Sequence, residues 1–348
     1  MPRITTALDT GRIRGAVRRS LPVIVVTLVT GVVGSLFLAS YSSALGEPIP
    51  RNVPIGVVGP TNLTQQVNDV VDAQDRTTYR VSRFDNEMTA RGAIERQDVY
   101  GVLVARPDGR YTLLTSAAAS LIVANMLDSL VPSLEAGVNG PVTVDDLHPL
   151  HAHDPEGLVI FYVALATIIV GTVSEMQTRT NAPKLTEAGF LAADVFRVAI
   201  VSLMLSVTVV IAGHFETTPL FALWGILALG MMAAGSTVTL FRLIVGGRWI
   251  LIPTWLLFTI VSNPASGGAV APQLLPPVYS AIGRFLPTGA TVRAVRDVSY
   301  FPDAIHLEPF IVLSLWIVVT RLASSLIRAV HGRRDNRTAT PDTKGPAT

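Results

Sequence analysis

Long uncharged runs are the feature that most constrains what this chain can fold into. The first covers residues 21–41 and contains no charged side chain, which is enough for the roughly 20 helical residues that cross the hydrocarbon of a bilayer. Only 15% of all residues are charged and the mean hydropathy is +0.48, whereas soluble domains carry roughly 25% charged residues. The sequence therefore predicts an integral membrane protein.

Six apolar stretches predict six helical spans. They cover residues 21–41, 157–174, 195–213, 219–240, 249–261 and 308–327, and the fifth is the shortest. The first follows a basic segment at 1–20, so it could also be a secretory signal, but the apolar part of a signal is only about 7 to 15 residues long. We expect an uncleaved membrane anchor.

A soluble domain is inserted between the first two spans, at residues 42–156, where the charge density rises. Alternating apolar patterns predict strands at 53–58, 79–84, 99–105, 111–115 and 142–144, and helical spacing predicts helices at 61–74, 85–96 and 117–138. The helix at 61–74 has Thr61 as its expected N-cap and the next one has Asp85. The predicted fold class is an α-helical membrane bundle of six spans carrying a small α/β domain of mixed sheet.

Arginine and lysine positions predict the orientation. Both basic tails, Arg179 with Lys184, and Arg242 with Arg248 fall on one side of a six-span arrangement, and this side is cytoplasmic by the positive-inside rule. The α/β domain is then extracytoplasmic, and residues 175–194 form a polar cytoplasmic loop. The tail at 328–348 is too polar to fold and is expected to be disordered.

The segment at 262–307, between the last two spans, is an exception to that charge pattern, since it carries Arg284, Arg293 and Arg296 on the outer side. Apolar residues recur at helical spacing on either side of Pro287. The pattern predicts two short amphipathic helices, broken at Pro287, that lie at or dip into the outer leaflet.

The chain resembles the permease superfamily of type-2 ABC exporters, most closely its phage infection protein-like branch. The resemblance covers residues 21–329 and rests on five motifs: Val53-Pro54-Ile55-Gly56-Val57-Val58, Asp154-Pro155-Glu156-Gly157, Asn263-Pro264, Phe285-Leu286-Pro287-Thr288-Gly289 and Arg296-Asp297-Val298-Ser299-Tyr300-Phe301. It implies a plasma-membrane protein that exports a hydrophobic or amphipathic substrate. It also implies a homodimer, or a pairing with another permease half, and a cytoplasmic ATPase on a separate chain.

In those permeases a cytoplasmic segment between spans two and three docks the ATPase. By position this is residues 178–196 here, and its charged members Arg179, Lys184 and Glu187 are the candidates for coupling. The alternative is a non-transporting envelope protein whose outer domain binds a partner, a cell-wall component or a phage.

No pattern in the sequence predicts an enzyme or a cofactor. The chain has no cysteine, no GxxxxGK[ST] phosphate loop, no HExxH and no GxSxG. The chain is therefore not expected to hydrolyse nucleotide by itself. Its basic residues gather in the tails rather than on one continuous face, so no nucleic-acid partner is expected beside the lipid bilayer.

Four residues just before the second span are weak candidates for a metal site: His148, His151, His153 and Asp154. Imidazole and carboxylate groups are good zinc ligands. Neighbouring side chains in an irregular segment rarely converge on one ion, so we interpret the segment as a polar linker and predict no metal.

Arg321 lies inside the last predicted span, and an ionisable residue in a span is a candidate functional group. Two interpretations are open. The simpler is that the side chain extends to the nearby cytoplasmic interface. The other is a buried intramembrane pair with Asp194 or Glu175.

Overall fold

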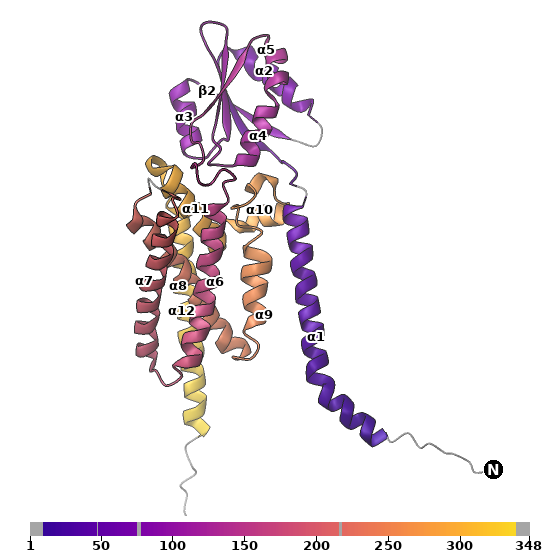
Figure 1. Ribbon diagram of the computed structural model, residues 1–348, viewed down its shortest axis with the longest axis vertical. Helices are drawn as coiled ribbons and strands as arrows, with labels where there is room; N and C mark the ends of the chain where they lie inside the picture. Colours follow the sequence, from indigo (N-terminus) through magenta and orange to yellow (C-terminus); the bar gives the residue numbers. More distant parts are fainter. Residues whose placement is uncertain (1–9, 47, 75–77, 216–217, 339–348) are drawn as a thin grey trace, which may run out of the picture.

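The computed structural model describes residues 10–46, 48–74, 78–215 and 218–338. It has two parts, an α/β domain and a helix bundle, which lie at opposite ends of the long axis (Figure 1). We call the end of the bundle that faces the α/β domain the proximal end and the opposite end the distal end. The helices α6, α8 and α12 run from the proximal to the distal end. The helix α7, which follows α6 in the chain, runs back from the distal to the proximal end (Figure 1).

The α/β domain is built on a five-stranded sheet with the strand order β2-β1-β3-β4-β5. The strands are β1 (Val53–Val58), β2 (Tyr79–Phe84), β3 (Gly101–Ala105), β4 (Tyr111–Thr115) and β5 (Val142–Asp146). Only the β3–β4 hairpin is antiparallel, and the other pairs are parallel. The mixed α/β domain predicted from the sequence is therefore present.

Helices cover both faces of this sheet because alternate strand residues point to opposite sides. Leu103 and Leu113 pack with α2 (Thr61–Asp72), α4 (Leu121–Ser129) and α5 (Val131–Val138), whereas Val102 and Leu114 pack with α3 (Glu87–Glu95). Figure 1 shows α3 on one side of the sheet and α2, α4 and α5 on the other.

Three details of the predicted helices in the domain are wrong. The single helix at 117–138 is two helices, α4 and α5, bent by 45° at Leu130, where Pro132 enters the first turn of α5. Proline is favoured there because its missing N–H would have no intrahelical partner. The N-cap of α3 is Asn86, which accepts a hydrogen bond from the Thr89 N–H at 2.9 Å, and α2 begins after Pro60 with no side-chain cap.

Within the described residues, five helices are long and apolar enough to cross a membrane. They are α6 (Val159–Asn181), α7 (Glu187–Ile211), α8 (Leu220–Val245), the part Val23–Leu45 of α1 (Thr10–Leu45), and the part Glu308–His331 of α12 (Glu308–Thr338). The predicted fifth span is a shorter apolar helix, Leu251–Ser262. It consists of α9 (Leu251–Thr254) and the π-helix η1 (Trp255–Ser262). Pro253, which has no backbone N–H to donate, lies in α9 two residues before the π-helix begins.

The helices exceed their predicted bounds at the distal end. The predicted polar loop at 175–194 is mostly helical, because α6 continues to Asn181 and α7 begins at Glu187. Likewise α12 continues to Thr338, through the first part of the tail that was expected to be disordered, and residues 339–348 lie outside the described residues. At the other terminus, α1 begins at Thr10, inside the predicted basic tail.

The helix α8 is the centre of the bundle. Inside the protein, 61% of its most apolar 18-residue stretch is buried, whereas only 6% of the corresponding stretch of α1 is buried. It packs against α6, α7, α12 and α11 (Pro287–Tyr300). The separate position of α1 is visible in Figure 1. This helix contacts η1, where Tyr41 accepts a hydrogen bond from Asn263 Nδ2 at 2.5 Å.

The segment between η1 and α12 contains the two predicted helices, α10 (Pro277–Gly283) and α11, and Pro287 begins the second. An amphipathic helix at a leaflet surface would leave one face uncovered by protein, but α11 does not. Nearly every residue of α11 is buried, including Arg296 and Asp297, because this helix packs between α6, α8 and α12. The end of α10 also lies close to α11, since a Cβ on Gly289 would lie 2.1 Å from the Gly283 carbonyl oxygen.

Candidate functional site

A cluster of charged side chains lies inside the distal half of the bundle. Its centre is Glu175 on α6, which is 1% exposed. Arg179 Nε lies 2.6 Å from Glu175 Oε1, and Arg197 Nη2 on α7 lies 2.7 Å from Glu175 Oε2. Thr239 on α8 donates its hydroxyl to Glu175 Oε1 at 2.6 Å. One carboxylate thus joins three helices.

The second carboxylate of this cluster is Asp194 on α7, which is also 1% exposed. Its Oδ1 lies 3.2 Å from Arg197 Nη2, and its Oδ2 lies 2.8 Å from Arg321 Nη2 on α12. Arg197 Nη1 also donates to Ser174 Oγ. We call Glu175, Arg179, Asp194, Arg197 and Arg321 the ionic cluster, and it links α6, α7 and α12 to α8.

Arg321 therefore forms the buried pair with Asp194 rather than extending to the interface alone. The pairing explains why its charge is tolerated in a span, since intramembrane charges are usually compensated by one another. Pairing also explains why Glu175, Arg179 and Asp194 stay inside the bundle: their charges are compensated across α6, α7 and α12, so they do not need to reach water.

The residues expected to couple to an ATPase do not share one environment. Arg179 is buried in the ionic cluster, and its guanidinium stacks 4.5 Å from the Phe190 ring centroid. Lys184 and Leu185 are exposed in the connection at 182–186, which we call the hairpin tip. Glu187 is exposed at the start of α7 and lies 3.2 Å from Arg328 on α12. An exposed docking surface can therefore include the hairpin tip and Glu187 but not Arg179.

The four weak metal candidates have separate contacts. Asp154 caps α6, accepting hydrogen bonds from the Leu158 and Val159 N–H groups at 2.9 and 3.1 Å. His148 Nε2 lies 3.2 Å from Glu95 Oε2, the His151 ring packs on Tyr300, and the His153 ring lies beside Gly213. Among the described residues, no group of three His, Asp or Glu side chains is arranged to hold a metal ion.

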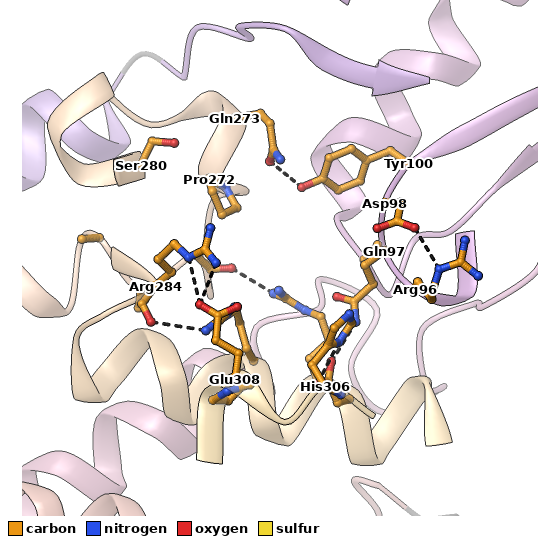
Figure 2. A pocket seen from close by; sticks show the side chains of 18 residues that line it. Arg96, Gln97, Asp98, Tyr100, Pro272, Gln273, Ser280, Arg284, His306 and Glu308 are labelled. Carbon is orange, nitrogen blue, oxygen red and sulfur yellow. Dashed lines mark hydrogen bonds and ion pairs between the residues drawn. The ribbon is translucent and has the colours of Figure 1, made fainter. Parts of the chain in front are cut away.

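A second polar site lies where the α/β domain meets the proximal end of the bundle. Tyr100 donates its hydroxyl to Gln273 Oε1 at 2.6 Å, and Gln97 donates to Asp297 Oδ1 on α11 at 2.8 Å. These residues line a cavity of about 460 Å³, which we call the junction cavity (Figure 2). Arg284, Arg293, Arg296 and Glu308 also line it.

Most charges around the junction cavity are paired. Glu308 accepts from Arg284 at 2.8 Å and from Arg293 at 3.1 Å, while Arg96 pairs with Asp98 at 3.0 Å. Asp297 Oδ2 lies 3.1 Å from both the His306 backbone nitrogen and its Nδ1. Burial raises the pKa of Tyr100 to about 12, so its hydroxyl stays neutral and can donate.

The sequence did not single out the junction cavity as a site, although one signal was present. Arg284, Arg293 and Arg296 were the exception to the positive-inside pattern, and all three line this cavity. These three side chains meet at one cavity because of how α10 and α11 fold back, and no local sequence pattern encodes this arrangement.

Comparisons of the chain with protein-family models, with curated proteins and with solved structures give no match. The chain's own residues therefore have to carry any conclusion about its function.

Proposed function

We propose that this chain is the permease subunit of an exporter that moves a hydrophobic or amphipathic substrate outward and is driven by a separate ATPase. In this proposal the protein lies in the plasma membrane, with the distal end in the cytoplasm and the α/β domain outside. The resemblance to type-2 ABC exporter permeases suggested this function.

The observation that supports the proposal most is the connection between the hairpin tip and the ionic cluster. The tip joins α6 and α7 through only residues 182–186, and the two helices are linked by Glu175, Asp194 and Arg197 directly behind it. A force applied to this tip therefore moves α6 and α7 rather than a flexible loop. This movement is transmitted to α8 through Thr239 and to α12 through Arg321.

A permease needs this kind of element because its own chain supplies no nucleotide-binding motif. Conformational change in one part of a protein acts at a distance through rigid elements that move as units. A short hairpin anchored by buried ion pairs is such an element, and its exposed Lys184 and Leu185 offer both charge and apolar surface to a partner.

The first test uses the full-length protein in its native membrane, with a photo-crosslinking residue at Leu185. A matched position is Arg248, which is also exposed at the distal end but lies in the connection between α8 and α9. We expect position 185 to capture an ATPase chain and position 248 not to. Lys184→Glu should reduce co-purification of that ATPase at least severalfold, whereas Arg248→Glu should leave it unchanged.

The second test measures ATP-dependent efflux of fluorescent amphipathic dyes from inverted vesicles, with and without Lys184→Glu. Loss of efflux together with loss of the ATPase supports the permease. If no ATPase is captured and the α/β domain on its α1 anchor retains the cellular activity, the proposal fails. The envelope-binding alternative then stands.

A further inference from the structure

Arg296 differs from the other arginines of the junction cavity because no carboxylate forms an ion pair with it among the described residues. Its side chain is buried, with 9% exposure, and its Nη2 donates to the Gly267 carbonyl oxygen at 2.9 Å. Its Nε is buried and has no hydrogen-bond partner. The neighbouring carboxylate, Asp297, is occupied by Gln97 and His306.

An unpaired guanidinium in this position is costly. Arginine keeps its charge in proteins, and a buried charge without an opposite charge costs several kcal/mol. Burial lowers the pKa of Arg296, and the neighbouring Asp297 carboxylate offsets this effect only in part. A site that retains such a group therefore needs a source of negative charge from outside the chain.

The space around Arg296 is suited to such an anion. Arg296 lines the junction cavity and also a second cavity of about 230 Å³ beside α4 and the start of α6. Pockets for small ligands typically measure about 300 to 1,000 Å³, so the junction cavity alone can hold a polar head group. Glu156 lines the second cavity, but it is exposed and forms no ion pair with Arg296 within the described residues.

The remaining charges leave the junction cavity positive. Four arginines line it, at 96, 284, 293 and 296, against three carboxylates, at 98, 297 and 308. Each carboxylate already has a partner, and Glu308 serves two arginines. Tyr100 and Gln273 add neutral polar groups to the wall (Figure 2).

From this arrangement we infer that the junction cavity binds an oxyanion, a phosphate or carboxylate group, through the Arg296 guanidinium. Arginine binds both groups well because its planar donors can form two parallel hydrogen bonds. The oxyanion belongs either to a lipid head group or to a free solute. The inference does not depend on transport, and it would hold equally for a non-transporting protein.

The test uses the full-length protein in phosphatidylcholine nanodiscs, with binding measured as a ligand-dependent rise of the unfolding midpoint. One arm adds glycerol 3-phosphate and acetate as free solutes. The other arm replaces part of the phosphatidylcholine with phosphatidylglycerol or phosphatidic acid. A rise with solutes identifies a free ligand, and a rise with anionic lipid alone identifies a head group.

Arg296→Gln should weaken the binding that is found by about 10- to 100-fold, the usual effect of removing a charge-assisted hydrogen bond. Arg296→Lys keeps the charge but not the paired donors, so its affinity should be intermediate. The matched control is Arg110→Gln, which removes an exposed arginine outside the cavity that is paired with Asp108 at 3.6 Å. Its affinity should change less than about threefold, because an exposed pair contributes little.

The ligand-free protein provides a second readout. Arg296 forms no ion pair within the described residues, and its side-chain hydrogen bond goes to the Gly267 carbonyl oxygen. Arg296→Gln should therefore lower the unfolding midpoint of the free protein only slightly, whereas removing an arginine from a buried ion pair would leave a destabilised chain. Ser280→Phe, which narrows the cavity at a residue that itself forms no ion pair, should also weaken binding. The inference is overturned if neither arm shows binding, or if binding survives both Arg296→Gln and Ser280→Phe unchanged.

Discussion

The most direct test of the ionic cluster is Glu175→Gln, which removes one buried negative charge and keeps the size of the side chain. In the native protein, Glu175 lies 2.6 Å from Arg179 and 2.7 Å from Arg197. The amide leaves both guanidinium groups facing a neutral group. Breaking a buried ion pair on one side costs about 3 to 5 kcal/mol, so we expect a loss of this size in the free energy of unfolding.

The control is Glu187→Gln, in the same helix pair but at the surface. Its ion pair with Arg328 spans 3.2 Å, and the Glu187 side chain is 62% exposed. Exposed pairs contribute about 0 to 1 kcal/mol. Unfolding in mixed micelles, followed by circular dichroism, should therefore show a large effect for Glu175→Gln and a small one for Glu187→Gln.

A double variant separates charge balance from side-chain packing. Adding Arg179→Gln to Glu175→Gln removes one positive charge for the negative charge already lost, and coupled neighbours typically interact by about 0.5 to 3 kcal/mol. We expect the double variant to be more stable than the sum of the two single losses predicts. Equal small effects for Glu175→Gln and Glu187→Gln, or strict additivity, would refute the view that buried charge pairing holds the four helices together.

Three further predictions concern other parts of the molecule. A Cβ on Gly171 would lie 2.9 Å from Met231 Cα, so Gly171→Ala should destabilise the α6–α8 contact by about 1 to 3 kcal/mol. Gly225→Ala, which meets nothing within 4 Å, should be neutral or slightly stabilising in the same micelle assay. Arg106 donates a hydrogen bond to Glu87 at 2.5 Å, and this bond is the largest of the causes that lower the pKa of the Glu87 carboxyl below its ordinary value. The ion pair therefore stabilises the fold above the ordinary pKa of glutamate, and this contribution is lost as the pH falls through the lowered pKa of Glu87. Hydrogen exchange of the α3 amides should therefore distinguish Glu87→Gln from the native chain at pH 6 and do so less and less as the pH is lowered, and a difference that grows on acidification would contradict the ion pair. Asn263→Ala removes the hydrogen bond to Tyr41. The chain has no cysteine, so cysteines can be introduced in α1 and α8 for spin labelling. The distance distribution between these labels should become broader in Asn263→Ala and stay narrow in Ser43→Ala.

Much of the fold follows from local patterns in the sequence. Three strands of the α/β domain, β1, β2 and β4, begin and end at the predicted residues, because alternating apolar residues bounded by turn residues encode a strand over a few positions. The α6, α7, α8 and α12 helices were found from apolar run length, since only a long apolar helix satisfies its backbone in a bilayer. Pro287 correctly marked the start of α11 because proline is favoured in a first helical turn.

Tertiary structure alone decided where the charged residues go. Glu175 and Asp194 looked like parts of a polar loop because composition cannot show that charges on two helices will neutralise each other. Arg296 lies in a segment that looked amphipathic, yet the whole of α11 is enclosed by α6, α8 and α12. The physical reason is the same in both places: the free energy of a buried charge depends on its surroundings in space. Residues that meet there lie far apart in the chain, 127 residues for Asp194 and Arg321 and 200 residues for Gln97 and Asp297.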